Sequence, residues 1–103
     1  TLANGLSESR RIAEMAELYD TMISPHNWMS PLGTLINAHL CAAVSNVEIL
    51  EIDLDDVPWK RDLLTHPLEI EDGQLVVPDR PGWGADIVEE VVRAHPLPAN
   101  RLP

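Results

Sequence analysis

Apolar residues recur at helical spacing near the start of the chain. Residues 7–20, SESRRIAEMAELYD, predict an amphipathic helix whose first turn is capped by Ser7. Its apolar stripe consists of Ile12, Met15, Ala16 and Tyr19. A stripe of this kind indicates that the helix covers other parts of the protein on one side.

The segments that follow alternate between strand-like and helix-like patterns. Residues 21–24, TMIS, are β-prone, and residues 33–46, GTLINAHLCAAVSN, are apolar on nearly all sides, which predicts a buried helix. Residues 47–54, VEILEIDL, predict a second strand. Such alternation favours a parallel sheet, and two short strands do not form one alone because parallel sheets are buried on both faces. We therefore expect an α/β fold in which this chain supplies part of a larger sheet or barrel.

The second half of the chain is rich in prolines and turn signals. Residues 68–78, LEIEDGQLVVP, predict a β-hairpin with Asp72 and Gly73 at its turn. Residues 87–95, IVEEVVRAH, predict a last helix with Asp86 as its cap.

Length and charge narrow the possible partners. The chain has 103 residues, which fits one small domain and is too short for a complete barrel of the larger α/β kind. It begins with Thr1, so we expect a processed or excised piece. Seven Lys and Arg against seventeen Asp and Glu give a formal net charge of −10, which disfavours nucleic acid and membrane surfaces as partners.

Cysteine content and hydropathy indicate a compartment. Cys41 is the single cysteine, so an internal disulfide is excluded. The longest apolar run is far shorter than a membrane span, and no signal peptide is visible. These features favour a cytoplasmic protein.

His26 is the first candidate for chemistry. It lies in SPHNWMSPLG, residues 24–33, directly after a predicted strand, where parallel α/β folds build their active sites. An imidazole there can take or give a proton near neutral pH. From position alone, a loop histidine bonded to the backbone is an equally good interpretation.

Glu51 is the second candidate, because it lies towards the end of the next predicted strand and would reach the same rim as His26. A buried carboxyl there would be neutral and donate a hydrogen bond, or would orient a substrate. A solvated charge is the favoured alternative, because Glu51 belongs to an acidic run. The carboxylates of that run are Glu48, Glu51, Asp53, Asp55 and Asp56. We expect no self-contained metal site in it, because the calcium-loop pattern is missing and alternate strand residues point to opposite faces.

Three separated motifs occur in an order that resembles the C-terminal part of the enolase superfamily. They are NGLSESRRIAEMAELYDTMISPHN, SPLGTLINAHLCAAVSNVEILE and LEIEDGQLVVPDRPGWGADI, and the resemblance extends up to about His95. Within that superfamily the chain is most similar to the mandelate racemase/muconate lactonizing enzyme-like branch, which includes sugar-acid dehydratases. The resemblance implies the C-terminal part of a modified TIM-type (β/α) barrel, incomplete in this chain. Residues 1–54 would be its last βα units, and residues 55–103 would return to the capping domain.

The same resemblance implies an activity. ISPHN matches the end of the family's seventh strand, so the role of catalytic histidine maps to His26. VEILE matches the eighth strand, and its final glutamate, which hydrogen-bonds the substrate carboxylate and stabilises an enediolate, maps to Glu51. Asn27 and Trp28 would line a pocket for a sugar acid. The family removes a proton next to a carboxylate, and Mg²⁺ stabilises the enediolate.

The resemblance also implies what this chain lacks. The family's three acidic Mg²⁺ ligands lie on earlier strands, so we expect no metal ligand here. The aspartate that partners the histidine would fall immediately before Thr1, so His26 is expected to lack its orienting partner. The prediction is a C-terminal fragment of a Mg²⁺-dependent acid-sugar dehydratase, a lyase, that is inactive alone. The alternatives are a racemase or epimerase of a 2-hydroxy acid, and a non-catalytic fragment that self-associates. As partners we expect a homo-oligomer or the missing N-terminal part.

Overall fold

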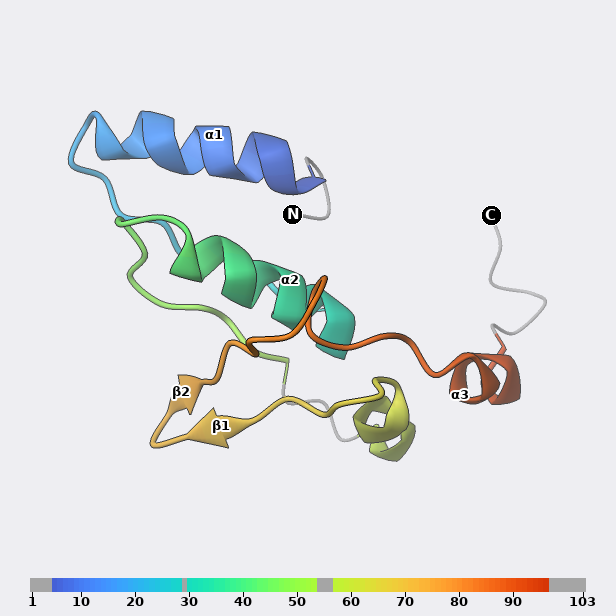
Figure 1. The fold of residues 1–103 in the computed structure, drawn as a ribbon. Coiled ribbons are helices and arrows are strands. Elements are labelled where there is room, and N and C mark those ends of the chain that lie inside the picture. Colours follow the sequence, from blue (N-terminus) through green and yellow to red (C-terminus); the bar gives the residue numbers. More distant parts are fainter. Residues whose placement is uncertain (1–4, 29, 54–56, 97–103) are drawn as a thin grey trace.

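The computed structural model describes residues 5–28, 30–53 and 57–96 of the chain. Its elements, in chain order, are α1 (Gly5–Glu17), α2 (Pro31–Ala42), the 3₁₀ helix η1 (Pro58–Asp62), β1 (Ile70–Glu71), β2 (Gln74–Leu75) and α3 (Glu89–Ala94). Figure 1 shows α1 and α2 side by side, the hairpin of β1 and β2 beyond α2, and α3 standing at the edge of the molecule. Among the described residues, no helix combines the length and the apolar character that crossing a membrane requires.

The first predicted helix forms, but its cap and its buried face differ from the prediction. Ser7 lies inside α1 rather than at its cap, because the helix begins at Gly5, whose φ of 68° glycine adopts readily. Of its residues only Ala13 is buried. Three residues of the predicted stripe, Ile12, Met15 and Tyr19, are exposed, and Tyr19, just beyond the helix, is 80% exposed, whereas Ala16 is half-buried. The described part of the chain therefore leaves most of this apolar stripe uncovered.

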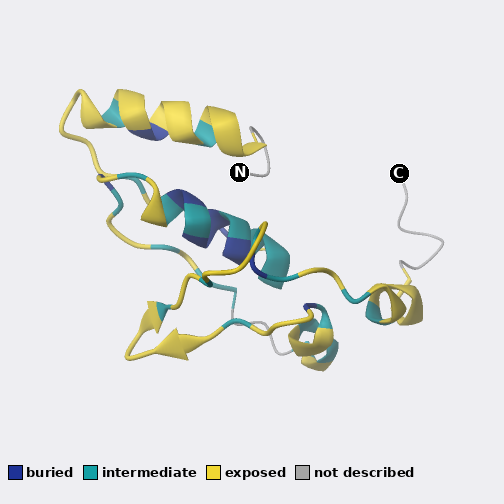
Figure 2. Ribbon diagram, in the orientation of Figure 1, coloured by how far each residue is buried: buried dark blue, intermediate teal, exposed yellow. Residues whose placement is uncertain are grey.

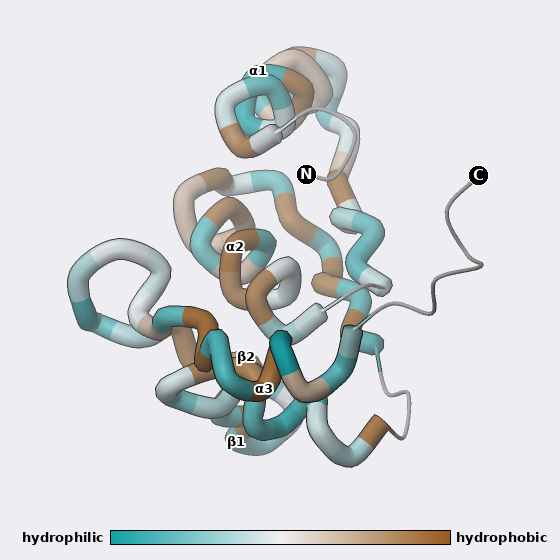
Figure 3. The backbone as a smooth tube through the Cα atoms, turned by 90° about the vertical axis from the view of Figure 1, so that its right-hand side faces the viewer, coloured by the Kyte–Doolittle hydropathy of each residue, from teal (hydrophilic) through white to brown (hydrophobic). Residues whose placement is uncertain are grey.

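α2 carries the core of the molecule (Figure 2). It starts two residues earlier than predicted, because the Ser30 side chain accepts a hydrogen bond from the main-chain N–H of Gly33 and Pro31 occupies the first turn. Five of its residues are buried, and they are Thr34, Leu35, Asn37, Ala38 and Leu40. Figure 3 shows apolar positions on both helices, although only α2 is enclosed by the rest of the chain.

The two predicted parallel strands are reduced to a single bridge. Ile23 and Val47 pair in parallel, and the hydrogen bonds run from Ile23 N to Asn46 O at 2.7 Å and from Glu48 N to Ile23 O at 3.0 Å. No longer strand forms in the described parts of residues 21–24 and 47–54. Parallel strands are normally part of a sheet that is covered on both faces, and among the described residues these two segments pair only with each other.

Asn46 ties the bridge to α1. Its side-chain amide donates to Ala13 O at 3.0 Å and to Thr21 O at 2.9 Å. These two bonds hold the end of α1, the turn after it and the bridge in one arrangement. The segment that leads to His26 is therefore fixed by a buried polar side chain as well as by its main chain.

The second half forms the predicted hairpin. Asp72 and Gly73 both adopt positive φ, 48° and 76°, which is the geometry of a tight hairpin turn, and Ile70 pairs with Leu75. The last helix also forms, but Val88 rather than Asp86 precedes it, and no side chain caps it. The main chain of Asp86 is instead used in pairing with Thr65.

Two contacts fasten the second half onto the first. His39 of α2 lies 3.1 Å, through Nε2, from the main-chain oxygen of Trp83, and the two rings are 5.7 Å apart. Asp53 forms an ion pair with Lys60 of η1 at 2.6 Å, and the Asp53 side chain is largely buried. The division of the chain at residue 54 into a barrel part and a cap part stays a prediction.

Candidate active site

The parallel bridge brings the two predicted catalytic residues to one place. His26 follows Ile23 by three positions and Glu51 follows Val47 by four, and both segments run in the same direction. Their side chains meet, with His26 Nδ1 at 2.5 Å from Glu51 Oε2. The predicted meeting of these residues at one rim is confirmed. Their catalytic roles stay a prediction at this point.

The pair is open to solvent. The side chain of His26 is 71% exposed and that of Glu51 is 50% exposed. The pKa of Glu51 is lowered from its usual value, first by the hydrogen bond from the main-chain N–H of Asn27. His26 lowers that pKa further, by hydrogen bond and by charge, while partial desolvation and the charge of Asp53 act in the opposite direction. Glu51 is therefore held as a carboxylate.

This geometry bears on two expectations drawn from the sequence. Glu51 is half-exposed and accepts hydrogen bonds as a carboxylate, which agrees with the favoured interpretation of a solvated charge and not with a buried, neutral donor. His26 was expected to lack an orienting partner, and in this structure its Nδ1 contacts the Glu51 carboxylate. An ionised Glu51 requires the hydrogen on Nδ1 of the ring, so the neutral imidazole presents the lone pair of Nε2.

Asn27 and Trp28, the two predicted substrate-binding residues, lie in opposite environments. Asn27 is 3% exposed, and its amide nitrogen donates to Thr34 Oγ1 at 2.8 Å and to the Glu51 main-chain oxygen at 3.0 Å. Both amide hydrogens of Asn27 are thus used inside the chain. Trp28 is exposed, and nothing in the described contacts brings it to His26. A substrate-binding role stays a prediction for both residues, and for Asn27 the geometry favours a role in positioning.

Thr34 is hydrogen-bonded to Asn27 beside the His26–Glu51 pair, and it was not predicted from the sequence as part of the site. It is buried in the first turns of α2, and its hydroxyl lies 3.2 Å from the main-chain oxygen of Ser30. A Ser-Pro pair in front of a helix-like pattern is a known start signal. Reading that signal would have placed Thr34 one turn into the helix and next to the loop of His26.

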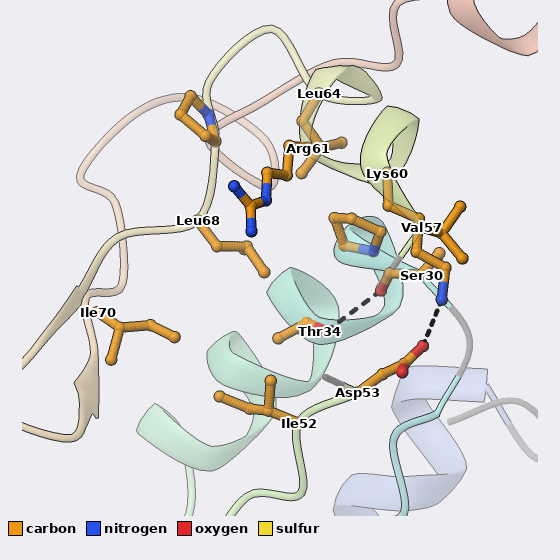
Figure 4. A pocket seen from close by; sticks show the side chains of 12 residues that line it. Ser30, Thr34, Ile52, Asp53, Val57, Lys60, Arg61, Leu64, Leu68 and Ile70 are labelled. Atoms are coloured by element: carbon orange, nitrogen blue, oxygen red, sulfur yellow. Dashed lines mark hydrogen bonds and ion pairs between the residues drawn. The ribbon is translucent and has the colours of Figure 1, made fainter. Parts of the chain in front are cut away.

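Thr34 also lines a pocket of about 540 Å³ (Figure 4). The first turn of α2 and the pair Ile52 and Asp53 form one part of its wall, and the segment from Val57 to Ile70 forms the rest. His26, Asn27, Trp28 and Glu51 do not line it. The pocket is therefore separate from the open His26–Glu51 pair.

The described residues do not form a metal site. In residues 5–28, 30–53 and 57–96 no three His, Cys, Asp or Glu side chains come together as a ligand set. Asp55 and Asp56 of the acidic run lie outside the described residues. The donor set around Glu51 consists of one imidazole and one carboxylate, which does not fit Mg²⁺ and its preference for several oxygen ligands.

Comparison with known proteins decides the family. Residues 1–91 match the family model described as enolase C-terminal domain-like. The chain belongs to this family. Its enolase C-terminal domain-like fold is α/β, and several solved structures similar to it belong to the mandelate racemase/muconate lactonizing enzyme group.

Individual relatives of this enolase-type chain are enzymes. It is 33% identical over 98 residues to a D-xylonate dehydratase from Haloferax volcanii, which covers 95% of this chain and 24% of the relative. Among solved structures, a Burkholderia xenovorans protein provisionally assigned as an L-alanine-DL-glutamate epimerase, with magnesium and fumarate bound, is 47% identical with a TM-score of 0.86. That match covers 90% of this chain and 23% of the other.

A mandelate racemase/muconate lactonizing enzyme-like protein from Rubrobacter xylanophilus is 40% identical with a TM-score of 0.80, over 88% of this chain and 24% of the other. The enolase-type chain described here therefore spans about a quarter of the length of the relatives it matches.

Proposed function

We propose that this chain forms the C-terminal part of an acid-sugar dehydratase that removes a proton next to a substrate carboxylate. The observation that carries the proposal is the His26–Glu51 pair, 2.5 Å apart at the shared end of two parallel segments. The similarity to a D-xylonate dehydratase supports a sugar acid as the class of substrate.

In this proposal His26 is the general acid and base. Its Nδ1–H is held by the Glu51 carboxylate, so Nε2 accepts the proton from the carbon next to the substrate carboxylate. The imidazolium that forms is stabilised by the negative charge of Glu51. The same ring can then return the proton to a departing hydroxyl group, which leaves as water. Proton transfer by a positioned group of this kind contributes about 10²–10⁴-fold to a rate.

Magnesium belongs to the proposal only through the relatives. One similar structure contains magnesium, and the described residues of this chain do not form a set of ligands for it. We infer that the complete enzyme uses Mg²⁺ and that its ligands lie outside this chain. No step above depends on a residue of this chain binding metal.

The chain alone is proposed to be inactive and to need a partner. It corresponds to about a quarter of its relatives, and the apolar side chains along α1 lie in solvent. We infer that this face is covered in the working protein by the remaining part of the enzyme or by a second copy of it. Exposed apolar surface of this kind marks sites of association.

A racemase or epimerase is the second candidate, and one observation favours it. The structure with 47% identity is provisionally assigned as an epimerase, and that identity exceeds the 33% identity to the dehydratase. Both reactions begin with removal of the same kind of proton. They differ in whether the proton returns to carbon or a hydroxyl group leaves.

The test is a screen of the intact enzyme against sugar acids and 2-hydroxy acids in deuterated water. A dehydratase yields a keto acid, whereas an epimerase returns substrate that carries solvent deuterium without a keto acid. His26→Asn is expected to lower turnover by about 10²-fold or more for either reaction. Unchanged turnover of every accepted acid by His26→Asn would refute the proposed role.

A further inference from the structure

We propose that Thr34 and Asn27 are positioning residues that hold Glu51 in place for its work with His26. The inference rests on the proposed function, because it assigns how the partner of the catalytic imidazole is fixed. Neither residue is proposed to touch the substrate.

Asn27 holds Glu51 at two points. Its main-chain N–H donates to Glu51 Oε2 at 2.9 Å, and its side-chain amide donates to the Glu51 main-chain oxygen at 3.0 Å. The first bond orients the carboxylate, and the second fixes the backbone from which the carboxylate extends. The oxygen that receives the N–H is the same Oε2 that faces His26 Nδ1.

Thr34 in turn holds Asn27. The second amide hydrogen of Asn27 goes to Thr34 Oγ1 at 2.8 Å, and the Thr34 hydroxyl donates to Ser30 O at 3.2 Å. Ser30 is the cap of α2, so the series of bonds begins on the rigid first turn of a buried helix. It ends at a carboxylate that is open to solvent.

The difference in burial indicates which residues of this series of hydrogen bonds hold the others in place. Asn27 and Thr34 are each 3% exposed, whereas His26 and Glu51 are largely exposed. An exposed glutamate side chain can adopt many rotamers, and in most of them the Glu51 carboxylate would not contact His26. Buried groups with satisfied hydrogen bonds restrict that choice, because breaking one bond leaves a polar atom without a partner inside the protein.

Three variants of the intact enzyme test this series. Thr34→Val removes the hydroxyl and keeps the shape, so it leaves one buried amide hydrogen of Asn27 without an acceptor. Thr34→Ser keeps the hydroxyl and serves as the conservative variant. Thr65→Val is a control for the same substitution away from the candidate site, because the hydroxyl of Thr65, which is exposed, accepts from the main chain of Asp86 instead.

We expect Thr34→Val to lower kcat by about 10–100-fold, as the loss of a supporting hydrogen bond does around a reacting group, with KM changed little. Thr34→Ser should recover most of the lost kcat. The thermal midpoint of each variant is measured in parallel. A role in stability alone would lower the midpoint and leave kcat per folded molecule unchanged, and that result would overturn the inference.

A double-mutant cycle with Glu51→Gln provides the decisive readout. If Thr34 acts through Glu51, then Thr34→Val should change kcat by less than about twofold once Glu51→Gln is present. Multiplicative losses from the two substitutions would overturn the inference while leaving the role of Glu51 intact. A Glu51→Gln variant with wild-type turnover would refute both this inference and the role of Glu51 in the proposed function.

Discussion

α1 and α2 have nearly the same length, 13 and 12 residues, and lie next to each other, but they are used in different ways. α2 buries five residues, three of them apolar and two of them polar, whereas α1 buries only Ala13. The candidate site is attached to α2 through Thr34. The helix that is packed within the described part of this chain is therefore the one that holds the candidate site.

α1 and the turn after it expose apolar side chains to solvent. Leu18 is 82% exposed and Leu35 is 3% exposed, although the two residues are chemically identical. Their difference is a matter of neighbours and not of composition. Substitutions of the same residue type at or next to each helix therefore measure how much of its stability each helix gains from packing within this chain.

The largest expected effect comes from the matched pair of leucines. Leu35→Ala should lower the free energy of unfolding by about 2–5 kcal/mol, because it removes buried methyl groups and leaves a cavity. Leu18→Ala should change it by less than about 0.5 kcal/mol, as exposed substitutions do. Urea unfolding of the chain, followed by tryptophan fluorescence, gives both values. Equal losses would mean that Leu18, just after the end of α1, is as well packed in solution as Leu35 of α2, contrary to the structure.

A smaller effect is expected from substitutions that change how strongly copies of the chain associate with one another. In analytical ultracentrifugation, the average molar mass of the chain should rise with concentration. The reason is that the described residues leave apolar side chains of α1 exposed. Met15→Lys together with Leu18→Lys should weaken this association. Ile70→Lys is the control, because Ile70 is an exposed apolar residue of β1, away from α1. A monomer at every concentration, or an equal effect of Ile70→Lys, would contradict this use of α1.

The smallest effect is a dependence of stability on pH at the α2-supported site. The pKa of Glu51 in the folded chain lies below its ordinary value of 4.5, chiefly because of the N–H of Asn27. Its contribution is therefore complete above pH 4.5 and is lost as the pH falls through the lower folded value.

Urea unfolding at a series of pH values provides the measurement. We expect the stability advantage of the wild-type chain over Glu51→Gln to shrink as the solution is acidified below the ordinary carboxyl range. An advantage that stays constant over the whole acid range would show that Glu51 is not held as a carboxylate in the folded chain.

Local patterns in the sequence predicted the local structure well. The hairpin turn at Asp72 and Gly73 and the existence of all three helices follow from short segments and were confirmed. The family resemblance was confirmed by the match over residues 1–91. The meeting of His26 and Glu51 also followed, because the ends of neighbouring parallel segments share a rim.

The features that the sequence did not predict depend on contacts between distant segments. The helical spacing of apolar residues reveals the stripe of α1, but it does not indicate which segment packs against that stripe. Asp86 resembles a cap, and its main chain pairs with Thr65 instead. The bond from Asn27 to Thr34 requires knowledge of where the loop returns to the helix. The acidic run favoured a charged Glu51, but it could not identify Asn27 and His26 as the partners of that carboxylate.

The single bridge between Ile23 and Val47 has a consequence for how the site assembles during folding. His26 and Glu51 are 25 positions apart, so they come together only when the intervening chain closes a loop. Closing a flexible loop costs entropy that grows only slowly with its length, by about 0.6 kcal/mol for each doubling. α2 replaces half of that loop by a rod about 18 Å long, which leaves fewer arrangements to search. An insertion in the turn after α2 should therefore be tolerated better than one in the first turn of the helix, where a single residue added before Thr34 would rotate Thr34 away from Asn27.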